Sequence, residues 1–140
     1  EDDVSTPNKE WGTYVLFTSN LDSWNTSALR QVSELGINMP QARQLTDGTI
    51  VIVNRKDMLN YAATMETVVM ASYDGGLTFE NRGTLDLERK NLFAYENFGS
   101  SVYQFASGRV YAIVSHGDRN FNGRFADLTM FDITSMVIKN

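Results

Sequence analysis

The chain of 140 residues contains no cysteine and only one histidine, His116. Without cysteine, a disulfide scaffold, thiol catalysis and a thiolate zinc site are excluded. One histidine excludes a metal site of several imidazoles, and a serine triad would depend on His116 alone. The sequence also lacks a phosphate-binding loop, a Gly-x-Ser-x-Gly elbow and any apolar run near the roughly 18 residues of a membrane span. We therefore expect neither these forms of catalysis nor insertion into a membrane.

Positive charge is scarce as well. Lys and Arg together number 12 against 17 Asp and Glu, which gives a net charge of −5 and a pI near 4.8. A protein of this charge repels phosphate backbones and anionic lipid, so nucleic acid and membrane surfaces are not expected partners. Apolar residues make up 42% of the chain, which is ordinary for a globular domain and argues against disorder.

Short β-rich runs separated by turn residues follow a polar arm at residues 1–10. Asp-Gly and Ser-Gly turns join several runs, because glycine reaches positive φ without steric penalty. No stretch keeps a helical period over ten residues, and 57–66 is interpreted as a loop, with a helical turn as the alternative. The pattern therefore predicts an all-β fold. The expected strands are Tyr14–Thr18, Ala28–Val32, Gln41–Leu45, Thr49–Asn54, Thr67–Ser72, Thr78–Leu85, Ser101–Phe105, Arg109–Ser115 and Leu128–Ile133.

Two segments share one pattern, in which Gln41 corresponds to Ser101. Gln41–Val53 and Ser101–Ile113 each contain a short strand, a glycine turn at the eighth position and a second apolar strand. Gly48 and Gly108 occupy the two turns. Repeats of roughly 40–50 residues that carry four strands are typical of propeller blades. The repeat therefore predicts consecutive four-stranded antiparallel sheets.

One motif lies between two of the predicted strands. Ser72, Asp74, Gly76, Thr78 and Phe79 have the spacing Ser-x-Asp-x-Gly-x-Thr-aromatic, which resembles the Asp-box (BNR repeat) of sialidases and related β-propellers. Asp74 is expected to accept hydrogen bonds from N–H groups of the turn, and Gly76 to take a conformation that side chains disfavour. Thr78 and Ser72 are expected to bond across the turn, and Phe79 to pack beneath it. The resemblance covers about residues 11–133 and implies a sialidase-like propeller.

The resemblance divides the chain into an arm at 1–10, a partial blade at 11–37, a blade with the Asp-box at 38–90 and a further blade at 91–140. Sialidase propellers have six blades, whereas this length supplies about two and a half to three. A partial propeller leaves open sheet edges, which pair readily with other chains. We expect either association with the remaining blades of a larger protein or a homo-oligomer that completes the ring. A shorter β-fold with a single Asp-box hairpin is the third alternative.

Few catalytic residues of the family are carried over. The sialidase arginine that grips a sugar carboxylate corresponds to Met39, and a thioether cannot replace a bidentate guanidinium. Asp57 lies near the position of the family's acid/base aspartate, with a solvated loop carboxylate as the alternative. Arg55 is a candidate for binding an anionic sugar, with a surface arginine as the alternative.

A polar segment near the C-terminus matches the opening of an oxygen-rich calcium loop. Asp118, Asn120 and Asn122 stand at alternate positions, a glycine follows, and Asp127 is near. Hard oxygen ligands at this spacing suit Ca²⁺. The glutamate of an EF-hand is missing, since Thr129 occupies its place. A polar hairpin loop without metal is the alternative, and no other cofactor is expected.

Three functions follow from the resemblance. The first is a glycan-recognising module on an extracellular, periplasmic, virion or cell surface, without complete catalytic machinery of its own. The second is an exo-sialidase or related glycoside hydrolase whose missing residues come from other blades or a second subunit. The third is a structural or protein-binding propeller, with or without stabilisation by calcium. The fold alone does not decide among these functions, because propellers host many activities.

Overall fold

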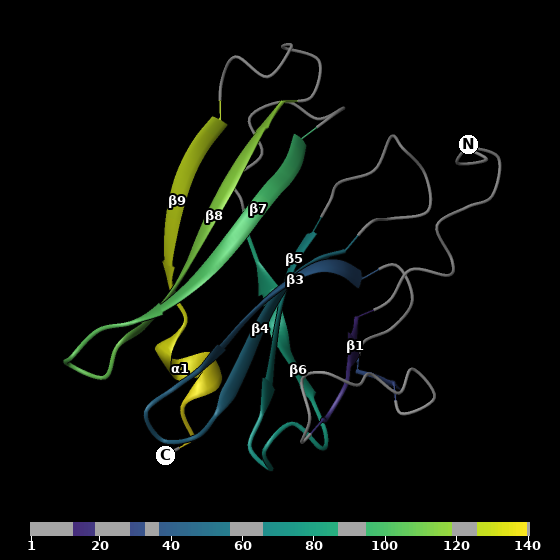
Figure 1. Ribbon diagram of the computed structural model, residues 1–140. Coiled ribbons are helices and arrows are strands. Elements are labelled where there is room, and N and C mark those ends of the chain that lie inside the picture. The colour runs from purple at the N-terminus through teal and green to yellow at the C-terminus, as the bar shows by residue number, and fades with distance from the viewer. Residues whose placement is uncertain are drawn as a thin grey trace, which may run out of the picture.

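A computed structural model describes residues 13–18, 29–32, 37–56, 66–86, 95–118 and 126–139, and the fold is that of these residues. They form three antiparallel sheets and one short helix, α1 (Thr134–Val137), as Figure 1 shows. The all-β prediction is confirmed, and within the described part of the chain no sheet closes on itself. No helix in the described ranges is long and apolar enough to cross a membrane.

The three sheets follow one another along the chain. The N-terminal pair consists of β1 (Tyr14–Val15) and β2 (Arg30–Gln31). The middle sheet has the order β3-β4-β5-β6, with strands Ile37–Gln44, Ile50–Lys56, Glu66–Ser72 and Glu80–Leu85. The C-terminal sheet has the order β7-β8-β9, with strands Tyr95–Gln104, Val110–Asp118 and Ala126–Asp132.

The two central strands of the middle sheet, β4 and β5, are buried on both faces. Successive side chains of a strand point to opposite faces, so β4 and β5 can remain apolar throughout only if both faces are covered. One face packs on the C-terminal sheet in the main core, where β4 contributes Val51 and Val53 and β8 contributes Val110, Ala112 and Val114. The other face forms a small cluster of Ile52, Val68 and Met70, against which Val32 and Phe79 pack. The chain is therefore a stack of layers.

The repeat seen in the sequence is present in the backbone. Leu45 donates its N–H to the Thr49 carbonyl (2.8 Å), and Phe105, at the matching position of the second segment, donates to the Arg109 carbonyl (2.8 Å). The strands on either side of these turns pair as antiparallel hairpins, and each hairpin contains a register shift, between Asn38 and Gln41 in the first. The two hairpins begin the middle and C-terminal sheets.

The two large sheets approach most closely at their first strands. β7 lies against β3 and β4, and Ser100 Oγ donates to the Val53 carbonyl (3.4 Å). Figure 1 shows β9 and β6 on the far sides of this contact. Helix α1 contacts β5, β6 and β8 between the diverging outer strands, with Val137 fully buried.

Each predicted strand has a counterpart with somewhat different bounds, and two strand starts and one helix depart most from the prediction. β7 begins at Tyr95 instead of Ser101, because the polar residues before Ser101 pair with β8 across a register shift between Asn97 and Gly99. β3 includes Pro40, which is tolerated on an edge strand where the register shifts. Helix α1 was not predicted, because four residues are too few for a helical period.

Candidate functional site

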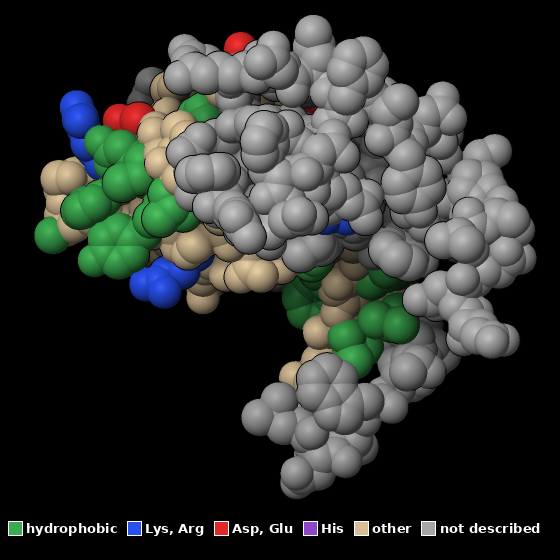
Figure 2. Space-filling view, turned by 90° about the horizontal axis from the view of Figure 1, so that it is seen from above, with side chains coloured by type: hydrophobic (Ala, Val, Ile, Leu, Met, Phe, Trp, Pro, Cys, Tyr) green, Lys and Arg blue, Asp and Glu red, His purple; other side chains and the backbone are tan. Residues whose placement is uncertain are grey.

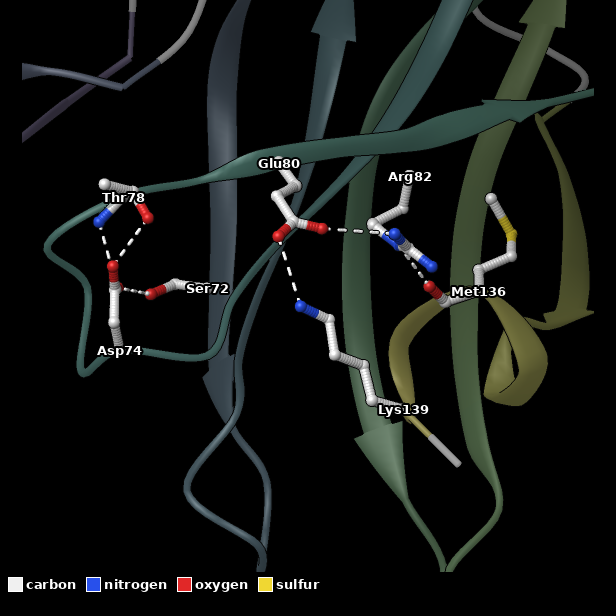
Figure 3. Close-up of polar contacts among 7 residues, drawn as sticks. All are labelled: Ser72, Asp74, Thr78, Glu80, Arg82, Met136 and Lys139. Atoms are coloured by element: carbon white, nitrogen blue, oxygen red, sulfur yellow. Dashed lines mark hydrogen bonds and ion pairs between the residues drawn. The ribbon is translucent and has the colours of Figure 1, made fainter.

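The turn Ser72–Phe79, named the Asp-box turn after its sequence pattern alone, joins β5 to β6 and is organised around one carboxylate. Asp74 Oδ1 accepts hydrogen bonds from Ser72 Oγ (2.8 Å) and from the Thr78 N–H (2.9 Å). Asp74 Oδ2 accepts a third from Thr78 Oγ1 (2.5 Å), and Figure 3 shows these contacts. Ser72 Oγ in turn accepts from the Gly76 N–H (2.8 Å). Both carboxylate oxygens are thus engaged within the turn.

These hydrogen bonds set the protonation state of the turn. The Thr78 hydroxyl, then the Thr78 N–H and the Ser72 hydroxyl, hold the pKa of Asp74 well below its usual range. A carboxylate that accepts several hydrogen bonds favours its ionised form. Because its lone pairs are directed at its own turn, Asp74 acts as a structural tie.

The Asp-box turn also contacts the N-terminal pair. Arg30 donates from a guanidinium nitrogen to the Leu77 carbonyl (2.6 Å). Gly76 has φ of +92°, and a Cβ built on it would lie 3.0 Å from Cζ of Phe17. Phe79 is half-buried against the small cluster of the middle sheet. The turn therefore connects the first and second layers of the stack.

The C-terminal segment, residues 133–139, binds the other side of the same hairpin. Arg82 Nε donates to the Met136 carbonyl (2.6 Å). Glu80 accepts from Lys139 Nζ (3.2 Å) at one oxygen and from Arg82 (3.2 Å) at the other. Figure 3 shows these residues reaching across from β6 to α1 and the segment beyond it. The hairpin β5–β6 is thus held from both neighbouring layers.

Arg55 lies at the opposite end of the middle sheet, near the end of β4. Its backbone pairs with Asn38 on β3 and Thr67 on β5. Alternation along β4 places Arg55 on the same face as Val53, the face that the C-terminal sheet covers. It is half-buried. A guanidinium at the end of this interface is suited to a carboxylate ligand. Asp57, the acid/base candidate, lies outside the described residues.

Two of the four calcium candidates, Asp118 and Asp127, lie near one end of the C-terminal sheet. In the ladder, Asp118 pairs with Tyr95, and Asp127 pairs with His116. The register therefore brings the strand ends that carry Asp118 and Asp127 together. Asn120 and Asn122 lie outside the described residues. Across the parts of the chain that are described, no three acidic, histidine or cysteine residues are grouped to hold a metal ion.

Met39 lies within β3, next to the shift in register with β4. The fold thus places Met39 and Arg55 on neighbouring strands, while Ser72, Asp74 and Thr78 lie at the other end of the sheet. The candidate ligand-binding residues and the Asp-box residues are therefore separated by the length of the strands.

Two sets of side-chain hydrogen bonds, one at Asn54 and one at Asp132, were not predicted from the sequence. Asn54 is fully buried and accepts at Oδ1 from Thr13 Oγ1 (2.9 Å), which links the N-terminal pair to β4. Asp132 accepts from the Thr134 hydroxyl (2.6 Å) and N–H (3.1 Å), and these bonds lower the pKa of Asp132. An Asn at the end of an Ile-Val-Ile-Val run and an Asp-x-Thr triplet were the available signals.

Comparison of the chain with protein-family models, with curated proteins and with solved structures found no match.

Proposed function

We propose that the chain is a glycan-recognising module of sialidase-like propeller build. The observation that carries this proposal is the Asp-box turn, in which Asp74 ties Ser72 and Thr78 across the hairpin between the third and fourth strands of a sheet. Two further features support it. The β-hairpin that opens the middle sheet recurs at the start of the C-terminal sheet, and the sheets pack face to face with their first strands closest.

The proposed binding site is the end of the stack that carries Arg55. In a propeller, ligands bind where strand ends and loops of several blades converge. Arg55 is half-buried at the end of the interface between the two large sheets. A guanidinium recognises the carboxylate of an acidic sugar through paired hydrogen bonds. The proposed ligand is therefore a glycan with an acidic terminal sugar.

Recognition without turnover is favoured over hydrolysis by Met39. Sialidases resemble this chain at the opening of the blade, but an arginine stands there in that family, and Met39 has no hydrogen-bond donor. Retaining hydrolysis also requires a nucleophile and an acid/base residue on either side of the scissile bond. The resemblance carries over Asp57 as a candidate acid/base residue but no nucleophile.

A glycan array probed with the full chain tests the proposal. We expect binding to acidic glycans and no release of sialic acid from a fluorogenic substrate. Arg55→Ala should weaken binding at least about tenfold, because a charge-assisted hydrogen bond is lost. Arg43→Ala is the matched control, since Arg43 is exposed and lies on β3 toward the Asp-box end. Absence of binding to every glycan would refute the proposal, and turnover that requires Asp57 would favour the hydrolase.

A further inference from the structure

The C-terminal sheet presents an apolar outer face. Its inward residues Val110, Ala112 and Val114 are fully buried against the middle sheet. The residues that alternate with them point the other way, and the exposed fraction is 73% for Leu128 and 53% for Met130. The outer face carries Tyr103, Tyr111, Ile113, Leu128 and Met130, together with the polar residues Ser101, Ser115 and Asp132. Figure 2 shows hydrophobic side chains gathered on the left, where Figure 1 places β9 and the β7–β8 turn.

Aromatic contacts extend this outer face to the β7–β8 turn. The ring of Phe105 lies edge-on to the rings of Tyr103 (4.9 Å) and Tyr111 (5.2 Å). Tyr103 and Phe105 are nonetheless 48% and 42% exposed. A contiguous apolar patch of this kind on a soluble protein marks an interaction surface.

The internal repeat shows how such a face is covered. On the middle sheet, Val53 pairs with Val69, and both are fully buried by the C-terminal sheet. On the C-terminal sheet, Ile113 occupies the place in the repeat that Val53 has on the middle sheet, and it pairs with Met130 in the same way. The outer face is therefore the counterpart of a face that is buried elsewhere in the same chain. The face of the middle sheet that carries Val53 and Val69 is covered by the inward face of the C-terminal sheet.

The other end of the stack carries the complementary surface. Val32 packs toward the middle sheet, and Arg30 reaches the Leu77 carbonyl on the same side. Alternation then directs Gln31 and its ladder partner Tyr14 outward. The exposed fraction is 45% for Tyr14 and 48% for Leu29. The outward side of the N-terminal pair is thus an exposed surface at Tyr14 and Leu29.

We propose that a second copy of this chain covers the outer face with the outward side of its own N-terminal pair, so that copies associate head to tail. The contacts within the chain join two different faces, and continuing them between copies gives a heterologous interface. Such an interface closes into a ring or extends as a filament, according to the rotation at each step. The proposal does not depend on glycan binding.

The mass in solution tests this association. Sedimentation across a range of concentrations should give multiples of the 15.8 kDa monomer. Met130→Glu should return the protein to the monomeric mass with its β-sheet circular-dichroism spectrum unchanged, because the side chain is exposed. Leu77→Glu is the matched control, since Leu77 has the same exposed fraction of 53% on a different surface. It should leave the assembly intact.

A mixing experiment tests the head-to-tail arrangement. Tyr14→Lys disrupts the outward side of the N-terminal pair, and Met130→Glu disrupts the outer face of the C-terminal sheet. Each variant alone should therefore be monomeric. Mixed in equal amounts, they should form a dimer and nothing larger. The intact N-terminal side of Met130→Glu can bind the intact outer face of Tyr14→Lys, and no second pair of intact surfaces remains. A monomeric wild type at every concentration overturns the proposal. Persistent dimers of Tyr14→Lys would also overturn it, since they require two outer faces to pair with each other.

Discussion

Lys139 places its ammonium group 3.7 Å from the centre of the Tyr73 ring. Tyr73 is the second residue of the Asp-box turn, and the same ammonium group forms an ion pair with Glu80 at the start of β6. Val137, two residues before Lys139, is fully buried in the main core. The C-terminal segment is therefore held by exposed charge contacts with the β5–β6 hairpin and by side chains buried in the main core, Val137 among them, and these contributions can be separated.

The charge contacts should contribute little. Lys139→Ala removes the cation–π contact and the ion pair, and should lower the free energy of unfolding by about 0.5–1 kcal/mol, because both lie at an exposed site. Urea denaturation at low and high salt measures the change. Lys139→Arg, which keeps the charge, is the control and should retain most of the stability. A loss at low salt that persists in full at high salt would contradict the electrostatic account.

The buried contact should contribute more. Val137→Ala removes two methyl groups from the main core and should destabilise the protein by about 2 kcal/mol. Ser135→Ala is the control on the same helix, because Ser135 is exposed, and should change stability by less than about 0.5 kcal/mol. Equal melting temperatures for the two variants would show that α1 does not contribute to the fold.

Alanine substitutions at two neighbouring glycines can distinguish the cost of backbone strain from the cost of steric contact. Gly75 and Gly76 both have positive φ, but a Cβ meets nothing within 4 Å at Gly75 and lies 3.0 Å from Phe17 at Gly76. Gly75→Ala should cost about 1–2 kcal/mol from φ alone. Gly76→Ala should cost more, because Phe17 must also move. In Gly76→Ala, further substitution Phe17→Leu should recover part of the loss, and thermal unfolding of the three variants measures it.

The fold could be predicted where local chemistry dictates it. Asp-Gly and Ser-Gly turns fix the hairpins at Gly48 and Gly108 in the sequence itself, and both are present. The run Ile50–Val53 indicated a strand but not its surroundings. Alternation cannot be seen when both faces of a strand are apolar, so the two-sided burial of β4 became evident only from the packing.

The site could be predicted less well than the fold. The Asp-box residues are close in sequence, so their contacts follow from a local pattern. The tie between Thr13 and Asn54 joins residues 41 apart and has no local signature. The position of Arg55 at the end of an inter-sheet contact depends on how β7 packs on β4, which no short motif encodes. Long-range contacts of this kind depend on the whole topology.

Acid should weaken the protein partly through Asp74. Its pKa is lowered in the folded protein, chiefly by the Thr78 hydroxyl, whereas in the unfolded chain it returns to about 3.9. The ionised form therefore stabilises the fold fully above the unfolded value, and this contribution falls as the pH drops from there toward the folded pKa. Asp74→Asn cannot ionise and should be less stable than the wild type at pH 7. Chemical denaturation of both proteins from pH 7 to pH 3 should show the difference shrinking below about pH 4. A difference that stays constant over this range would mean that the carboxylate charge does not tie the turn.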